Sequence, residues 1–179
     1  MVNDVQEILL SEEKIALKIK ELGKAISEEY AGKDLLVIGV LKGSVIFVSD
    51  LVRNISIPCE MDFMSVSSYG ESSESSGVVR ILKDLDNSIE GKDVIIAEDI
   101  IDSGITLEYL VDFLKGRNAK SIEIVTLLSK PARRKVDIDV KYIGFEVPDE
   151  FLVGYGLDYA NRYRNLPFVG ILKRSVYEK

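Results

Sequence analysis

The sequence predicts an α/β protein with a mainly parallel central sheet flanked by helices. Residues 35–40 (LLVIGV) and 94–97 (VIIA) are short continuous apolar runs, which are typical of strands buried on both faces. Segments of helical periodicity separate these runs, and alternation of strand and helix favours a parallel sheet. With 179 residues the chain is long enough for one hydrophobic core, so we expect a single domain over residues 1–179.

The first predicted helix covers residues 12–30. Ser11 is a suitable N-cap, and Glu12 and Glu13 complement the positive end of the helix dipole. Apolar residues then recur at helical spacing: Ile15, Ile19, Leu22 and Ile26. We therefore expect an amphipathic helix that packs on the sheet.

The other predicted elements follow in alternation. Further helices are expected at residues 45–55 and 106–115. Residues 70–77 (GESSESSG) are too polar and too rich in glycine and serine to pack, which predicts a loop. The tail from residue 150 has no clear periodicity. The predicted strands lie at residues 35–40, 60–69, 78–85, 94–97, 122–128 and 140–145.

Composition excludes several classes of chemistry. Cys59 is the only cysteine and there is no histidine, so the chain cannot form an intrachain disulfide, a Ser-His-Asp triad or a histidine-based zinc site. A formal charge of −7 argues against nucleic acid or anionic lipid as a partner. Neither a signal peptide nor a membrane span is recognisable, and we expect a cytoplasmic protein.

A candidate anion site follows the predicted strand at residues 94–97. Glu98 and Asp99 come directly after this strand, at the sheet edge where open parallel sheets bind ligands. Residues 102–106 (DSGIT) then lead into a helix, whose free N–H groups and positive dipole end attract anions. The loop has no lysine, which excludes a P-loop. A plainer alternative is that Asp102 is a helix cap and that the other acids are solvated.

Residues 94–106 (VIIAEDIIDSGIT) closely resemble the signature of type I phosphoribosyltransferases. The resemblance implies that Glu98 and Asp99 face the ribose hydroxyls and Mg²⁺. It implies that the following loop cradles the 5-phosphate of phosphoribosyl pyrophosphate, and that Asp102 lies near N7 of the purine as general base. The implied phosphate-binding residues are Asp102, Ser103, Gly104, Ile105 and Thr106.

Two shorter segments resemble the same family. Lys42 and Gly43 lie in residues 41–44 (LKGS), which look like its pyrophosphate-binding loop, in which the peptide bond before the lysine is often cis. Ser68 and Tyr69 resemble the serine-tyrosine pair of the lid in hypoxanthine-guanine enzymes. Taken alone, these segments could be a glycine turn with an exposed lysine and a flexible hairpin loop.

Residues 150–166 (EFLVGYGLDYANRYRNL) match the purine-binding hood of the hypoxanthine-guanine family. The resemblance implies that Phe151 stacks on the base, the Leu152 backbone reads its edge, Asp158 binds a second Mg²⁺ and Arg164 holds pyrophosphate. Lys130 would donate to O6 of a 6-oxopurine, which disfavours adenine. It further implies a core at about residues 35–145 and a hood from about 146 to 179 with the N-terminal segment. Otherwise Lys130 is a solvated charge, and Phe151 and Tyr155 are core aromatics.

The implied reaction transfers the phosphoribosyl group to N9 of hypoxanthine or guanine with Mg²⁺ as cofactor, giving IMP or GMP and pyrophosphate. Relatives form dimers or tetramers, so a homo-oligomer is expected. Ser44 and Ile105 depart from residues common in the family, and Arg133 and Arg134 are interpreted as surface residues. The alternatives are an RNA-binding regulator of the same superfamily, which the acidity disfavours, and an adenine or xanthine enzyme.

Overall fold

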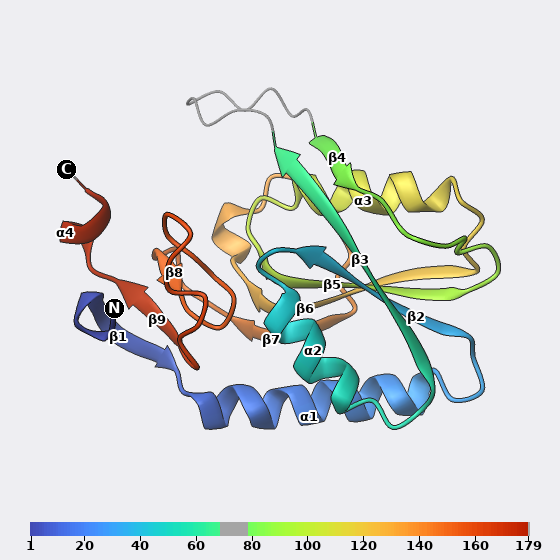
Figure 1. The fold of residues 1–179 in the computed structure, drawn as a ribbon, viewed down its shortest axis with the longest axis horizontal. Coiled ribbons are helices and arrows are strands. Elements are labelled where there is room, and N and C mark those ends of the chain that lie inside the picture. The colour runs from blue at the N-terminus through green and yellow to red at the C-terminus, as the bar shows by residue number, and fades with distance from the viewer. Residues whose placement is uncertain (69–78, 179) are drawn as a thin grey trace.

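A six-stranded sheet forms the centre of the computed structural model, which describes residues 1–68 and 79–178 (Figure 1). Its strand order is β4-β3-β2-β5-β6-β7, and only the pairing of β4 with β3 is antiparallel. The predicted mainly parallel sheet is therefore confirmed. The strands are β2 (Leu35–Leu41), β3 (Cys59–Ser68), β4 (Val79–Lys83), β5 (Asp93–Ile101), β6 (Ser121–Ser129) and β7 (Tyr142–Glu146).

Helices cover both faces of this sheet. The helices α1 (Glu12–Glu29) and α2 (Val45–Arg53) lie on one face, and α3 (Ile105–Lys115) lies on the other (Figure 1). The side chains of β2 alternate between the two apolar clusters that result, which explains the continuous apolar run of this strand. Among the described residues, no helix is long and apolar enough to cross a bilayer.

Ser11 caps α1 as predicted, since its side chain accepts a hydrogen bond of 3.3 Å from the backbone N–H of Lys14. The helix ends at Glu29, one residue before the predicted end. Two short 3-10 helices lie elsewhere in the chain, η1 (Val2–Asp4) and η2 (Pro131–Arg133).

A second, three-stranded antiparallel sheet forms a hood beside the carboxyl ends of the central strands (Figure 1). It joins β1 (Val5–Leu10), β9 (Val169–Leu172) and β8 (Leu152–Val153) in that order, and the short helix α4 (Arg174–Tyr177) follows. Our sequence analysis assigned no strand here. Two-residue and four-residue strands are too short to show a period, so only their pairing across the chain defines them.

The strand β5 is longer than predicted and continues to Ile101. Its last part still pairs with β6, because Ile100 and Ile101 lie opposite Leu128 and Ser129. Glu98 and Asp99 consequently lie inside the strand and not after it, and pairing of Glu98 and Ile100 with β6 fixes their position. The predicted strand ended at residue 97 because the polar residues Glu98 and Asp99 interrupt the apolar run.

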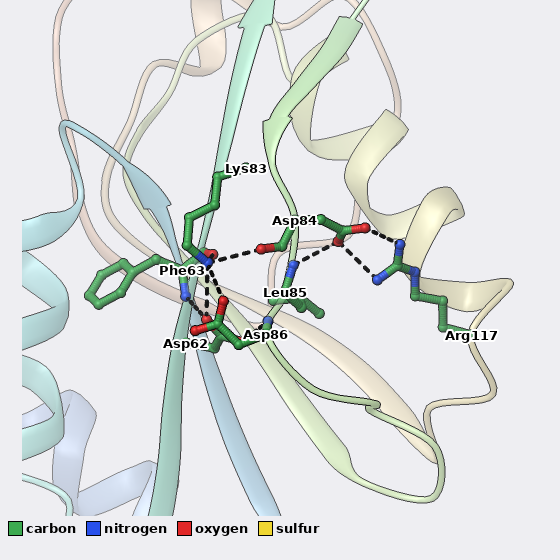
Figure 2. Close-up of polar contacts among 7 residues, drawn as sticks. All are labelled: Asp62, Phe63, Lys83, Asp84, Leu85, Asp86 and Arg117. Carbon is green, nitrogen blue, oxygen red and sulfur yellow. Dashed lines mark hydrogen bonds and ion pairs between the residues drawn. The ribbon is translucent and has the colours of Figure 1, made fainter.

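Figure 2 shows a polar network that fastens the edge strand β4. The Lys83 ammonium donates to the backbone carbonyls of Phe63 and Asp84, at 2.9 Å each, and to the carboxylate of Asp86 at 3.1 Å. The Arg117 guanidinium, which follows α3, donates to both carboxylate oxygens of Asp84, at 2.9 and 2.5 Å. These contacts tie the chain after β4 to β3 and to the end of α3.

Candidate active site

The chain changes direction across the sheet between β2 and β5. From β2 the chain continues outward to β3 and β4, whereas β5 leads to β6 and β7 on the other side. The two strands are parallel neighbours, so their carboxyl ends lie together, and such a switch point is where open α/β sheets bind ligands. Residues 41–44 follow β2 and residues 98–106 end β5, so the predicted site segments meet here.

Two neighbouring cavities open at this edge, with volumes of about 580 and 260 Å³. They share Ile100 and Asp102 as lining residues. The larger one is lined by these predicted residues: Asp99, Asp102, Lys130, Phe151, Leu152, Asp158 and Arg164. The smaller one is lined by Glu98, Asp102, Ser103, Gly104 and Thr106. The predicted phosphate-binding and purine-binding residues thus surround two spaces that meet at Asp102.

The smaller cavity lies at the N-terminus of α3. Gly104 is the N-cap of this helix with φ of 84°, a left-handed conformation that favours glycine. The loop is held from outside, since the backbone N–H of Lys135 donates to the carbonyl of Ser103 at 2.9 Å. Since Gly104 is itself the cap, the alternative that Asp102 caps α3 is wrong. The first turn of α3 thus begins beside a space that Ser103, Gly104 and Thr106 line, and the N-terminus of a helix favours an anion.

Arg133 is exposed, as our sequence interpretation had it, but that interpretation also left it out of the site. It lines the larger cavity, and its Nε lies 3.3 Å from Oδ1 of Asp102. Its Nη1 lies 3.4 Å from Oδ1 of Asp149, another cavity residue. The 3-10 turn η2, which begins with Pro131, brings this side chain back toward the site. Proline after the strand end was the available signal in the sequence.

Arg134 also makes contacts below the surface. Its Nη2 donates a 2.9 Å hydrogen bond to the hydroxyl of Ser129 at the end of β6. A Cβ atom on Gly104 would lie 3.2 Å from Cδ of Arg134, so this side chain covers the phosphate loop.

Glu98 and Asp99 form an acidic pair in which Asp99 is buried and Glu98 is half-buried. Asp99 is 7% exposed, and one carboxylate oxygen of Glu98 is buried without a hydrogen-bond partner among the described residues. Burial, and then the negative charge of Asp99, raise the pKa of Glu98 well above its usual range. Burial also raises the pKa of Asp99, against the hydrogen bonds from Glu98 and from the backbone N–H of Ile100. A cation bound beside this pair would relieve both effects.

Asp158 is already engaged on both carboxylate oxygens. It accepts from the backbone N–H of Asn161 at 2.8 Å, and Nη2 of Arg164 lies 2.7 Å from its other oxygen. Arg164 also donates to the carbonyl of Gly156 at 2.6 Å. Asp158 and Arg164 therefore face the same cavity as a pair, and a metal at Asp158 would have to replace its contact with Arg164.

The predicted pyrophosphate loop packs against both the acidic pair and the hood. The peptide bond before Lys42 is cis, in keeping with the resemblance noted in the sequence. A Cβ atom on Gly43 would lie 1.8 Å from Oδ2 of Asp99, and one on Gly156 would lie 2.0 Å from the carbonyl oxygen of Gly43. Both glycines are thus needed for this close approach.

Several predicted residues lie apart from the two cavities. Among the described residues, Lys42, Gly43 and Ile105 line neither of them, and Lys42 is exposed. Ser68 is the last residue of β3, but its side chain is outside the described part of the structure. Tyr69 lies outside the described residues altogether, so the predicted lid is not tested.

Lys130 lies at the end of β6 and is only 7% exposed. Its ammonium donates to the carbonyl oxygen of Glu150 at 2.7 Å, so it is not the solvated charge of the alternative interpretation. Burial lowers the pKa of Lys130, and the negative charge of Asp102 partly opposes this. Its position in the cavity wall suits it to donate a hydrogen bond to a ligand.

Phe151 borders the same cavity from the hood and is 37% exposed, so it is not a core aromatic. Leu152 is buried in β8, where it pairs with Ile171. Arg174 and Tyr177 of α4 also line the cavity. Our sequence analysis missed both, because nothing in a tail without periodicity indicates that it folds back over the site.

Comparison with known proteins agrees with this geometry. The family model described as the phosphoribosyl transferase domain matches residues 5–160. The chain belongs to the phosphoribosyltransferase family. This phosphoribosyltransferase is 59% identical over 178 residues to the hypoxanthine-guanine phosphoribosyltransferase of Bacillus subtilis, covering 99% of each chain. It is 57% identical over 179 residues to the bifunctional protein TilS/HprT of Listeria monocytogenes, but spans only 28% of that longer protein.

Solved structures confirm the predicted type I phosphoribosyltransferase fold. The crystal structure of a hypoxanthine phosphoribosyltransferase from Staphylococcus aureus matches this phosphoribosyltransferase with a TM-score of 0.97 at 53% identity, covering 100% of this chain and 97% of that one. A hypoxanthine-guanine phosphoribosyltransferase from Bacillus anthracis matches with a TM-score of 0.88 at 47% identity, covering 94% of this chain and 98% of that one.

Proposed function

We propose that the chain transfers the 5-phosphoribosyl group from phosphoribosyl pyrophosphate to N9 of hypoxanthine or guanine. The products are IMP or GMP and pyrophosphate, so the reaction serves purine salvage. The observation that carries the proposal is the meeting of the two cavities at Asp102. One is an anion site at a helix N-terminus and the other joins a buried lysine to an exposed aromatic ring, which suits a substrate with a phosphate at one end and a base at the other.

The donor is held in the smaller cavity. Backbone N–H groups of residues 103–106 and the hydroxyls of Ser103 and Thr106 bind the 5-phosphate. Glu98 and Asp99 accept hydrogen bonds from the ribose hydroxyls at the boundary between the cavities. Lys42 and Arg164 bind the pyrophosphate, and the fixed dipoles of the loop position the ribose while positive charge builds at its C1.

Asp102 is the candidate general base because, among the described residues, it is the one acidic side chain that lines both cavities. A carboxylate there lies between the phosphate site and the base site, where it can take a proton from N7 of the purine. The chain has no histidine, which leaves a carboxylate as the natural choice.

Mg²⁺ is the proposed cofactor, and the acidic pair fits it. The buried oxygen of Glu98, which has no partner within residues 1–68 and 79–178, and the adjacent Asp99 provide oxygen ligands. Mg²⁺ is commonly held by one or two carboxylates together with substrate phosphates. When bound, Mg²⁺ neutralises the charge of the pyrophosphate leaving group. Asp158 fits a second Mg²⁺ less well, because its oxygens already contact Arg164 and Asn161.

Lys130 selects a 6-oxopurine in this proposal. Its ammonium donates to the oxygen at position 6 of hypoxanthine or guanine, whereas adenine presents an amino group there and would leave the buried donor unpaired. Phe151 stacks on the base and the Leu152 backbone contacts its edge. The full-length relatives named as hypoxanthine-guanine enzymes support this choice over adenine or xanthine.

A four-base assay tests the proposal. Purified protein with phosphoribosyl pyrophosphate and Mg²⁺ is incubated with hypoxanthine, guanine, xanthine or adenine, and the nucleotides are separated by chromatography. We expect IMP and GMP to form much faster than the other two products, and each reaction is repeated with EDTA. Exclusive use of xanthine or adenine would reassign the substrate. RNA retention at physiological salt without any nucleotide product would favour the RNA-binding regulator.

We also infer that residues 1–179 form one domain and that it acts in the cytoplasm as a homodimer or homotetramer. The single-domain proposal is supported by one apolar cluster that runs from α1 and the central sheet into the hood, where it includes Leu152 and Ile171. Size-exclusion chromatography with light scattering measures the oligomeric state.

A further inference from the structure

Three aromatic rings from the C-terminal part of the chain gather at the larger cavity. The rings of Phe151 and Tyr177 are stacked, with centroids 4.8 Å apart and planes 28° from parallel. Tyr159 meets Phe151 edge-on at 5.5 Å, with an interplanar angle of 90°. Tyr177 therefore covers one face of Phe151, while Tyr159 approaches at right angles.

The helix that carries Tyr177 is fixed at its start. The backbone N–H of Lys173, just before α4, donates to the carbonyl of Asp4 at 2.9 Å, and its ammonium donates to the carbonyl of Asn3 at 2.6 Å. Val176 and Tyr177 pack against an apolar cluster of the hood that contains Val153, Tyr163, Leu166 and Leu172. Tyr177 is thus held by the hood as well as by the ring that it stacks on.

The same helix turns two side chains toward the cavity. Arg174 and Tyr177 are three residues apart, which places them on one side of a helix, and both line the larger cavity with Phe151. An aromatic ring that is partly exposed has to be held in one orientation before a planar ligand can stack on it at low entropic cost. Tyr177 supplies that restraint for Phe151.

We propose that Tyr177 is a positioning residue for the base, acting through Phe151. The stacked pair presents a preformed aromatic wall, and the purine adds to it as a further ring. This inference rests on the proposed function and deepens it, because it makes α4 a determinant of base affinity and not of donor affinity. None of the described residues that line the smaller cavity, where the phosphate loop lies, belongs to α4.

The test compares Tyr177→Ala, Tyr177→Leu and Tyr177→Phe with a matched control, Tyr109→Ala. Tyr109 lies on α3, is 38% exposed and stacks on Phe113 with centroids 6.2 Å apart, outside both cavities. Binding of IMP is measured by calorimetry, and KM is measured for hypoxanthine and for phosphoribosyl pyrophosphate. Thermal unfolding is followed for every variant, and Tyr177→Leu retains apolar contact with the hood without the ring should the alanine variant unfold.

We expect Tyr177→Ala and Tyr177→Leu to weaken IMP binding about three- to tenfold and to raise KM for hypoxanthine by a similar factor, the worth of one aromatic pair. KM for the donor should stay within about twofold, and Tyr177→Phe should resemble the wild type because it keeps the ring. Equal rises in both KM values, or no change in IMP binding for the leucine variant, would overturn the inference.

The two proposals can fail separately. If the wild type binds IMP more tightly than the Tyr177 variants do but forms no IMP, the stacking inference stands and the proposed activity is refuted. If the wild type forms IMP but the Tyr177 variants bind IMP equally well, the proposed activity stands and the stacking inference is refuted. A wild-type protein that neither binds nor forms IMP would overturn both.

Discussion

The Nε atom of Arg133 lies 3.3 Å from Oδ1 of Asp102, so the candidate general base is paired with a guanidinium in the cavity wall. The same guanidinium lies 3.4 Å from Asp149 on the other side. Both side chains of the Arg133 and Asp102 pair are about half exposed, at 52 and 47%. Such pairs contribute little to stability, so Asp102 can exchange this partner for a substrate at low cost.

Asp102→Asn should lower kcat by at least about 100-fold and change KM for phosphoribosyl pyrophosphate by less than about threefold. An amide of the same shape cannot accept the proton, and a general base contributes chiefly in the transition state. Steady-state kinetics with hypoxanthine measures both constants. Loss of donor affinity in proportion to kcat would show that Asp102 has a structural role.

Arg133→Gln is the matched control for this variant, because it also breaks the contact between Arg133 and Asp102 but keeps the carboxylate. We expect kcat to fall less than about tenfold and the free energy of unfolding to change by less than about 1 kcal/mol. If Arg133→Gln lost as much activity as Asp102→Asn, the ion pair and not proton transfer would explain both.

Lys130→Met should raise KM for hypoxanthine by about tenfold or more and leave KM for the donor nearly unchanged. Methionine fills a similar volume but removes a charged donor, whose hydrogen bond is worth about 1.5 to 3 kcal/mol. The control is Lys135→Met at a nearby exposed lysine. Rates with adenine are measured in parallel, and an undiminished preference for hypoxanthine over adenine would refute the role of Lys130.

Gly104→Ala should destabilise the protein by about 1 to 3 kcal/mol and raise KM for the donor. The backbone of the alanine would have to keep a φ of 84°, and its Cβ would lie 2.9 Å from Cγ2 of Val136. Gly116→Ala is the control, since φ there is −67° and the nearest atom would be 3.5 Å away. Urea unfolding measures both, and equal stability of the two variants would contradict the close packing at Gly104.

Asp84→Asn should destabilise the protein at pH 7 by less than about 1 kcal/mol, and this difference in the free energy of unfolding should shrink as the pH is lowered. The hydrogen bonds from Arg117 (Figure 2), against a smaller effect of burial, lower the pKa of Asp84 below its ordinary value of 3.8. A lowered pKa in the folded state stabilises the protein above pH 3.8, and this contribution is lost as the pH falls through the folded pKa.

Urea unfolding of wild type and Asp84→Asn between pH 2 and 7 tests this. The control is Asp112→Asn, whose pair with Lys115 at 3.3 Å is open to solvent. If the difference in the free energy of unfolding between wild type and Asp84→Asn stayed constant across this pH range, ionisation of Asp84 would not be the cause of that difference.

Much of the central sheet and of the phosphate loop could be predicted, because both are local in sequence. The apolar run of β2 indicates burial on both faces, and the segment from Glu98 to Thr106 contains strand end, loop and helix start within nine residues. The family resemblance then assigned Lys130 and Phe151 to the site, and both line the larger cavity. Such short-range patterns can be recognised in the sequence without knowledge of contacts between distant segments.

The missed features all depend on contacts between distant segments. The strand β1 exists through its pairing with β9, and Tyr177 borders the site because Lys173 is bound by the first residues of the chain. Arg133 was set aside because a pair of arginines after a strand is usually solvated, and only the turn η2 shows where it points. No periodicity in a single sequence records these relations.

Because β1 pairs with β9, the two parts of the candidate site should form at different stages of folding. The phosphate loop itself lies within one strand-loop-helix unit, whereas the hood beside the larger cavity depends on partners such as Asn3 and Lys173, which are 170 positions apart. Contacts of such separation form late in folding, because closing a long loop costs entropy before any contact repays it. We therefore expect the phosphate loop to form early in folding, and the hood, which carries the proposed base-binding residues, to form last.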